Sequence, residues 1–285
     1  MNETREPLAE IAERINPLND YVFKRVIGEQ EDEKWLLAFV NAVLAKTGGG
    51  NIVSLNVDND KEIPPEYIAD KGNYLDVLAV TDKGDKINIE VQLINAGDMA
   101  KRSLFYWSRL YVKNFSKGKS YDVLQKAITI NILNYEFIKE LDAFHTSFHI
   151  REDEHKDYVL TGELEIHFLD MVKFRKQKAD IDNPLHRWLL FLDKNTKPEA
   201  LKEALEMDAI IAEAEAKLES LAKNEKDMGL YRMREKGLLD IISGMQSAKA
   251  EGIAEVAKSL KISGLLTIDQ IADVSGLSKE DVEKL

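Results

Sequence analysis

Residues 74–93 read YLDVLAVTDKGDKINIEVQL, two apolar runs separated by a polar turn. The Asp-Lys-Gly of residues 82–84 suits a three-residue loop, in which a type I turn is followed by a glycine in the left-handed conformation. Such a turn pairs Thr81 with Asp85 and fixes the register of both strands. The stretch is therefore predicted to form a β-hairpin, with residue 80 facing 86 and residue 78 facing 88.

This register places two acids opposite each other. Asp76 would face Glu90, with β-carbons roughly 4.5–5.5 Å apart, and Gln92 would share their face. The other face collects apolar residues predicted to be core: Leu75, Val77, Ala79, Ile87, Ile89, Val91 and Leu93. Two carboxylates this close repel each other unless a cation lies between them or one is protonated. Mg²⁺ is the natural partner, whereas a solvated polar face is the alternative for a bare hairpin.

The composition is that of a globular protein. The chain has 285 residues and 44% hydrophobic content, enough for a substantial core. It has no cysteine, which excludes disulfides and cysteine metal sites and is consistent with the cytoplasm, where we expect the protein. The N-terminus is charged and the apolar runs are too short to span a bilayer, so we expect a soluble protein with no membrane partner.

The charge is segregated along the chain. A formal net charge of −12 argues against a protein that coats nucleic acid through its overall field. One local basic run follows the hairpin, in which Asp98 is the only nearby acid: Lys101, Arg102, Arg109, Lys113, Lys117 and Lys119. Any contact with DNA is therefore expected to be local.

Hydrophobic periodicity predicts a mixed α/β core. Apolar spacing indicates one or two helices in residues 17–46 and another in residues 98–116. In the second helix, one apolar face is predicted to hold Leu104, Trp107, Leu110 and Tyr111. Besides the hairpin, four segments have strand patterns: IVSLNVD, LQKAITINIL, HTSFHI and DYVLTGELEIHFLDM. This order predicts a sheet flanked by helices.

The chain after Asn183 is predicted to be helical. We predict a first domain in residues 1–195 and a helical C-terminal region in residues 196–285, with a soft boundary between residues 195 and 225. The last segment has Ala272, Gly276 and Val282 at helix-turn-helix spacing. Its second helix is acidic and would be repelled by phosphates, so self-association or helical packing is favoured over reading of a DNA operator.

The hairpin carries the pattern of a nuclease core. An aspartate ending one strand and Glu-x-Gln in the next resembles the PD-(D/E)XK nucleases, here as Leu75-Asp76 and Glu90-Val91-Gln92. The match extends to NPLNDYVFKRV, YLDVLAV, INIEVQL, KRSLFYWSRLY, KAITINIL and LEIHFLDMVKF. Together these motifs resemble the Rpn family of recombination-promoting nucleases, also described as PD-(D/E)XK nuclease family transposases, over about residues 16–200.

The resemblance implies a restriction-endonuclease-like α/β fold and metal-dependent cleavage of DNA phosphodiesters, linked to recombination or transposition. It implies that Asp76 and Glu90 ligate Mg²⁺ or another divalent cation, with the Val91 backbone carbonyl as a further ligand. Gln92 stands where the family pattern has lysine. A neutral amide can position a water but cannot take its proton, so the metal must do more of the activation.

Other positions follow from the same resemblance. Asp20 and Lys24 are candidates for a third acid and a cation at the site, and a surface pair at i and i+4 is the alternative.

The helix after the hairpin offers phosphate-binding groups. Arg102 suits bidentate phosphate binding, and Lys101 and Arg109 are the other DNA-binding candidates; solvated helix charge is the alternative reading. Tyr106 and Trp107 are predicted to pack in the core.

Other motifs are weak. His145 and His149 are four residues apart but lack the glutamate of HExxH, so a metal role is disfavoured. No glycine-rich phosphate loop is present.

The sequence thus predicts a Mg²⁺-dependent DNA endonuclease. A homodimer or higher oligomer is expected, with the helical C-terminal region as its contact. A catalytically inactive DNA-binding or regulatory protein on the same fold is the first alternative. A self-assembling structural protein driven by the helical tail is the second.

Overall fold

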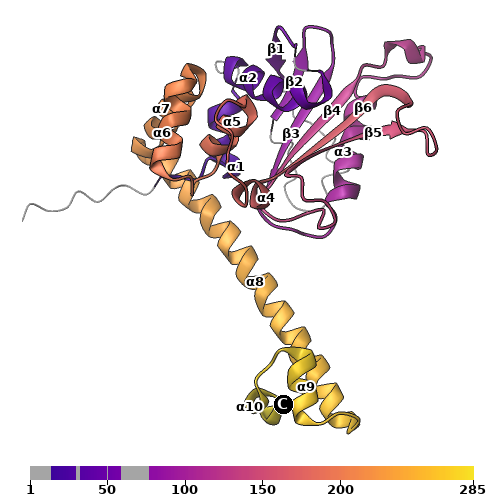
Figure 1. Cartoon of the computed structure of the whole chain (residues 1–285), viewed down its shortest axis with the longest axis vertical. Coiled ribbons are helices and arrows are strands. Elements are labelled where there is room, and N and C mark those ends of the chain that lie inside the picture. The colour runs from indigo at the N-terminus through magenta and orange to yellow at the C-terminus, as the bar shows by residue number, and fades with distance from the viewer. Residues whose placement is uncertain (1–13, 30–32, 50, 59–76) are drawn as a thin grey trace, which may run out of the picture. The chain divides into compact units, whose positions relative to one another are not determined.

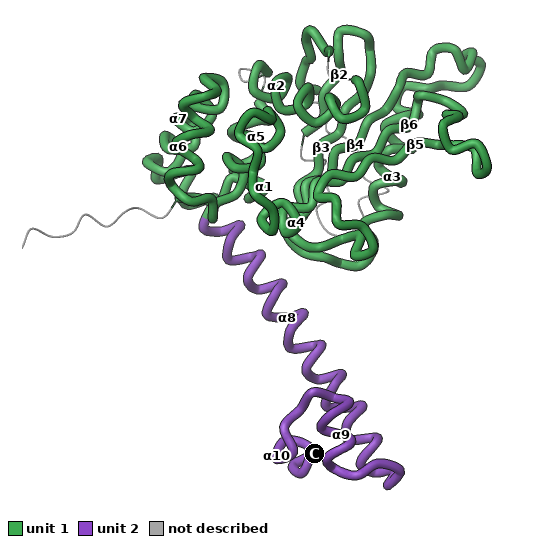
Figure 2. The backbone as a smooth tube through the Cα atoms, in the orientation of Figure 1, with its two compact units in different colours: residues 1–231 green, residues 232–285 purple. Residues whose placement is uncertain are grey.

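The computed structural model describes residues 14–29, 33–49, 51–58 and 77–285. The chain forms two compact units, residues 1–231 and 232–285 (Figure 2). The division falls within a single long helix. The predicted division after residue 195 into a nuclease-like domain and a helical region stays a prediction.

The elements follow the predicted order of helices and strands. The α-helices are α1 (Asp20–Ile27), α2 (Glu33–Leu44), α3 (Met99–Val112), α4 (Met171–Arg175), α5 (Pro184–Leu192), α6 (Pro198–Met207), α7 (Ala209–Lys223), α8 (Glu225–Ser263), α9 (Ile268–Ser275) and α10 (Lys279–Lys284). The strands are β1 (Leu55–Val57), β2 (Val77–Thr81), β3 (Lys86–Gln92), β4 (Ala127–Leu133), β5 (His145–Arg151) and β6 (Val159–Asp170). Within the described residues, no helix combines the length and the apolar character needed to cross a membrane.

One mixed sheet organises the first unit. Its six strands have the order β1-β2-β3-β4-β6-β5, in which β3, β4 and β6 are parallel and the other pairings are antiparallel. Figure 1 shows α3 on one side of this sheet and the group of α1, α2, α5, α6 and α7 on the other. The predicted α/β core, a mixed sheet flanked by helices with a helical C-terminal region, is confirmed.

The hairpin has the register that its turn predicts. Val80 pairs with Lys86, and two residues further Leu78 pairs with Asn88. Gly84 adopts the left-handed conformation, with φ of +86°. The hairpin is therefore positioned by local turn chemistry.

Replacing Gly84 tests this turn. Gly84→Ala is expected to lower the free energy of unfolding by about 1 kcal/mol, because an L side chain is strained at positive φ. Its β-carbon would also lie 3.3 Å from Gln125 Oε1. Gly162→Ala is the matched control, since no atom lies within 4 Å of its β-carbon and its φ is not in the left-handed range. Urea denaturation of both variants measures the difference. Equal stability of the two variants would contradict the role of the turn.

The sheet has two differently packed faces. One face carries the main core, to which α1, α2, α5 and α7 contribute, and we call it the helical face. Its strand residues include the predicted apolar set as far as it is described: Val77, Ala79, Ile87, Ile89 and Val91, with Leu93 packed against them. Leu75 lies outside the described residues. The opposite face, which we call the α3 face, is covered by α3 and holds smaller apolar clusters.

The helix α3 is rotated relative to the prediction. Its buried residues are Met99, Ser103, Tyr106 and Leu110. Of the predicted apolar face, Leu110 is buried and Trp107 and Tyr111 pack against the apolar clusters, whereas Leu104 is 51% exposed. The predicted face was wrong in this respect because the strands beneath α3 present polar side chains, against which Ser103 packs. The prediction that Tyr106 packs in the core is confirmed.

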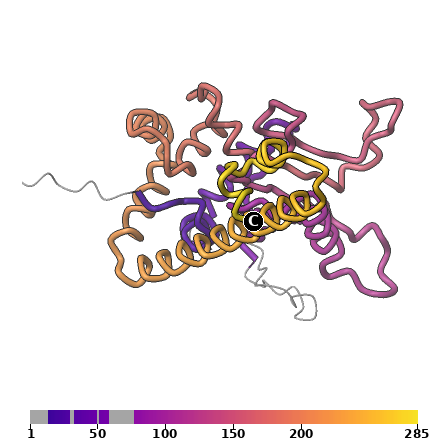
Figure 3. Tube along the Cα trace, turned by 90° about the horizontal axis from the view of Figure 1, so that it is seen from below, coloured from indigo at the N-terminus to yellow at the C-terminus, as the bar shows by residue number. Residues whose placement is uncertain are grey.

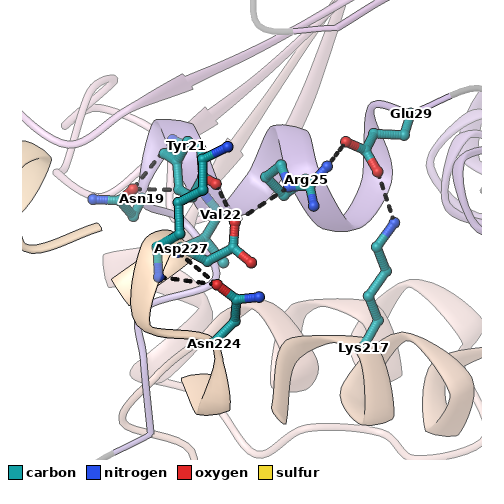
Figure 4. A network of polar contacts seen from close by, with 9 residues as sticks. Asn19, Tyr21, Val22, Arg25, Glu29, Lys217, Asn224 and Asp227 are labelled. Atoms are coloured by element: carbon teal, nitrogen blue, oxygen red, sulfur yellow. Dashed lines mark hydrogen bonds and ion pairs between the residues drawn. The ribbon is translucent and has the colours of Figure 1, made fainter. Parts of the chain in front are cut away.

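Polar contacts fasten α1 to the helices that follow residue 195 (Figure 4). The Tyr21 hydroxyl donates to Asp227 at the start of α8. Glu29, just after α1, accepts from Arg25 and from Lys217 Nζ on α7, the latter at 3.1 Å. Because α7 also contributes apolar side chains to the main core, it belongs to the same folded unit as the sheet.

The second unit has a small core of its own. Its buried residues are Ala257, Ile271, Ala272 and Val282. Gly276 ends α9 in the left-handed conformation, with φ of +71°, and α10 begins three residues later. Ala272 and Val282 thus pack α9 against α10 and α8.

Candidate active site

The strand β3 presents polar side chains toward α3. Because successive side chains of a strand point to opposite faces, Asn88, Glu90 and Gln92 lie on the α3 face. Glu90 is buried, with 2% of its surface exposed. Asn88 Nδ2 donates to Glu90 Oε1 at 3.2 Å, and Gln92 Nε2 donates to Glu90 Oε2 at 3.4 Å. The two amides stabilise the buried carboxylate by charge-assisted hydrogen bonds.

The neighbouring strand β4 adds oxygen atoms to this face. Asn131 is the register partner of Glu90, and its Nδ2 donates to Ser103 Oγ on α3 at 2.8 Å. Three buried oxygens here have no hydrogen-bond partner within the described residues: Asn88 Oδ1, Thr129 Oγ1 and Asn131 Oδ1. Buried polar atoms are normally paired, so these oxygens are available to a cation or a water.

Arg102 supplies positive charge beside Glu90. Its Nε donates to the Tyr106 hydroxyl at 3.3 Å, and its guanidinium lies 5.6 Å from the centre of that ring. Burial lowers the pKa of Arg102, but Tyr106 and the charges of Glu90 and Asp98 raise it, and the net shift is upward. The guanidinium is therefore a permanent cation at the edge of the site, as a phosphate-binding group requires.

Tyr135 is a second group near Arg102. Burial raises its pKa to about 12, with Arg102 opposing the shift and Asp98 and Asp170 adding to it. Its hydroxyl stays protonated at neutral pH and can donate a hydrogen bond. Sequence reasoning missed Tyr135, because only the packing of the segment after β4 brings it to this region. Asn88 and Asn131, by contrast, could have been found from the sequence, since each is a polar residue inside an apolar strand.

The other predicted DNA-binding residues lie on α3. Lys101 is exposed in the first turn, next to Arg102, and Arg109 is half-buried two turns further on. The structure thus brings Arg102 into the surroundings of Glu90 and places Lys101 on the solvent side of the same turn. Their contact with DNA stays a prediction.

The remaining predicted site residues are Asp76, Asp20 and Lys24. Asp76 lies outside the described residues, so its pairing with Glu90 stays a prediction; Val77, the next residue, pairs with Ile89. Asp20 is exposed in the first turn of α1, where it accepts from the Tyr21 backbone N–H at 2.8 Å. Lys24 is half-buried one turn later. The site roles of Asp20 and Lys24 also stay predictions.

Comparison with known proteins identifies the family. The family model of the PD-(D/E)XK nuclease family transposases matches residues 17–248, most of the chain. The protein therefore belongs to the PD-(D/E)XK nuclease family transposases. No match was found among the curated proteins or among the solved structures. The family links the chain to nuclease chemistry and to transposition.

A second polar cluster lies on the helical face, on β5 and β6. Glu165 on β6 accepts from Thr47 Oγ1 at 2.6 Å and from His167 Nε2 at 2.8 Å, and pairs with Lys126 Nζ at 2.5 Å. His167 Nδ1 lies 2.9 Å from His145 Nε2 on β5. One of these two ring nitrogens donates to the other, and the protonation of the rings sets the direction. These contacts link β5, β6 and Lys126, the residue before β4.

Ionisation in this second cluster is strongly shifted. Burial alone would raise the pKa of Glu165, but hydrogen bonds from His167, Lys126 and Thr47 hold it well below its usual range. Burial lowers the pKa of His145 to about 3, with His167 and Lys46 adding to the shift and Glu165 opposing it. In the described part of the chain, no group of three His, Cys, Asp or Glu side chains could hold a metal ion. The cluster is a buried network of hydrogen bonds and an ion pair.

Proposed function

We propose that this protein is a metal-dependent DNA endonuclease that acts in recombination or transposition. The observation that carries the proposal is the buried carboxylate of Glu90 on the Glu-x-Gln strand, held between two amides and beside a permanent cation. A buried charge is costly unless it is paired or serves a site. Membership of a nuclease family supports the same chemistry.

The donor set fits a hard divalent cation. Besides the Glu90 carboxylate, the α3 face offers the buried oxygens of Asn88, Thr129 and Asn131, which lack hydrogen-bond partners among the described residues. Mg²⁺ prefers oxygen ligands. In our proposal Asp76, Glu90 and the Val91 carbonyl hold the ion, which supplies the positive charge that polarises the phosphate and lowers the pKa of a bound water.

The protein's own groups then have distinct roles. Gln92, which donates one N–H to Glu90, keeps a carbonyl oxygen that can accept from the attacking water and orient it. Arg102 binds a non-bridging phosphate oxygen, where its charge stabilises the transition state. Lys101 and Arg109 hold the flanking phosphates, and Asp20 and Lys24 are further candidates for the site.

A plasmid assay tests the proposal. Purified protein is expected to convert supercoiled plasmid to the nicked form in Mg²⁺, and EDTA is expected to abolish this. Gel electrophoresis measures both forms, and mobility shift on the same samples measures DNA retention. Retention without nicking would contradict the enzyme and select the DNA-binding or regulatory protein. No DNA interaction together with a large oligomer would contradict both and select a structural assembly.

Gln92 is the residue that supports the alternative, a catalytically inactive DNA-binding or regulatory protein. Gln92 cannot take a proton from water, so a binding protein on the same fold would tolerate this residue equally well. Assignment to the Rpn group, assembly as a homodimer through the C-terminal helices and a cytoplasmic location are likewise proposals. Size-exclusion chromatography with light scattering would measure the oligomeric state.

A further inference from the structure

The segment after α3, residues 113–121, reads KNFSKGKSY and combines basic and aromatic residues. Together with α3 it makes residues 99–121 a stretch with six Lys or Arg and no Asp or Glu, in a chain of net charge −12. We call residues 113–121 the stacking loop. The loop extends outward from the end of α3, as the magenta segment in Figure 3 shows.

The stacking loop is held in a defined conformation. The Phe115 backbone N–H donates to Val112 at 2.9 Å, and the Lys119 N–H donates to Ser116 at 3.2 Å. Gly118 supplies a left-handed turn, with φ of +91°. A loop already ordered before binding loses little conformational entropy when a ligand binds.

Two aromatic rings in the loop form a stacked pair. Phe115 and Tyr121 have ring centres 5.6 Å apart and an interplanar angle of 16°. Tyr121 is 78% exposed, so its contact with Phe115 leaves most of its surface to solvent. Exposed aromatic side chains on a basic surface are platforms on which unpaired bases stack.

The start of the loop lies beside β3. Lys86 Nζ donates to the carbonyls of Leu110 at 3.1 Å and Lys113 at 2.9 Å, which fixes the start of the loop beside the first residue of β3. Glu90 is four residues further along this strand, or roughly 13 Å from Lys86 at about 3.3 Å per residue. The loop therefore begins beside the strand that carries Glu90.

We propose that the stacking loop binds DNA next to the cleavage site and that Tyr121 stacks on an unpaired base. This inference rests on the proposed nuclease function and names its substrate class, DNA with unpaired bases near the cleaved phosphate. Lys117 and Lys119 hold the backbone there, because Lys113 is already paired with Asp58 at 2.6 Å.

Charge favours DNA over a protein partner. Exposed apolar residues accompany the loop, namely Leu104, Phe105, Val112 and Val123, and these would also suit a second polypeptide. Asp58 pairs with Lys113, and Asp122 follows Tyr121. Even so, residues 99–121 carry six basic residues and no acid, and this excess of positive charge favours a polyanion, because a protein interface normally matches charges of both signs.

Substitution of Tyr121 provides the test. Fluorescence anisotropy in EDTA would measure binding to an intact duplex and to the same duplex with a short single-stranded gap. Tyr121→Ala is expected to weaken binding to gapped DNA by about 10-fold and leave duplex binding unchanged. Tyr121→Phe, which keeps the ring, is expected to bind both as the wild type does.

Lysine variants test the backbone contacts. The double variant Lys117→Ala, Lys119→Ala is expected to weaken binding to both DNAs and to lower the slope of log K against log salt concentration by about 1.4 to 1.8. Lys202→Ala, an exposed lysine on α6, is the matched control and should change neither.

Three outcomes would overturn the inference: no loss with Tyr121→Ala, equal loss on both DNAs, or dissociation of an oligomer with unchanged DNA binding. Because binding is measured without Mg²⁺, failure of wild-type protein to nick plasmid would remove the proposed nuclease function alone.

Discussion

Glu90→Gln is expected to slow Mg²⁺-dependent nicking by at least about 100-fold, a loss typical of removing one group that stabilises the transition state. The substitution keeps the shape of the side chain and removes the charge that a divalent ion requires. DNA retention should persist, since Lys101 and Arg102 are untouched. Time courses of plasmid nicking at fixed Mg²⁺ measure the rate, and mobility shift measures retention.

The same variant makes a second prediction, for stability. Without metal, Glu90→Gln is expected to unfold close to the temperature of the wild type, because it removes the desolvation cost of a buried charge together with the charge-assisted hydrogen bonds from Asn88 and Gln92. Glu199→Gln, on the exposed first turn of α6, is the control and should change neither activity nor stability. Undiminished nicking by Glu90→Gln would exclude Glu90 from the site. Loss of both activity and melting temperature would indicate a structural role instead.

Acid is expected to destabilise the protein through His145. Its pKa is about 3 in the folded protein, against about 6.5 in an unfolded chain. Between these values the unfolded chain binds a proton that the folded protein does not, so stability is fully present above pH 6.5 and falls as the pH decreases. The loss from this group is about 1.4 kcal/mol per pH unit, and roughly 4–5 kcal/mol in total by pH 3.

His145→Gln separates this effect from other titrations. Glutamine can still donate to or accept from His167 Nδ1, but it does not titrate. Between pH 4 and 6.5, the pH dependence of the unfolding free energy should therefore be smaller in the variant by about one proton. Burial also lowers the pKa values of His149 and His186, so some dependence will remain. Urea denaturation across this range measures the slope. His155→Gln is the exposed control, and equal slopes in all three proteins would contradict the assignment.

The hairpin and its polar face could be predicted because they depend on local rules. The turn at residues 82–84 fixes the pairing of β2 with β3, and the alternation of side chains then places Glu90 and Gln92 together. The pairing of Asp76 with Glu90 extends this register by one residue beyond the described part of β2, and stays a prediction.

The packing above that face could not be predicted in the same way. Periodicity alone put Leu104 in the buried stripe of α3, but the polar groups of β3 and β4 select Ser103 there instead. Such a rotation depends on contacts between residues about 28 positions apart. The hydrogen bonds that link Glu165 through His167 to His145 likewise depend on residues far apart in the sequence. In the sequence these are three ordinary polar residues on two segments.

The main core draws on residues from Ile15 to Leu221, which has a consequence for biosynthesis. The sheet is complete once Asp170 has been made, yet α5 and α7, which pack in the same core as α1 and α2, emerge from the ribosome only later. A nascent chain therefore displays apolar surface of this core before α5 and α7 can cover it, the kind of intermediate that aggregates or recruits chaperones.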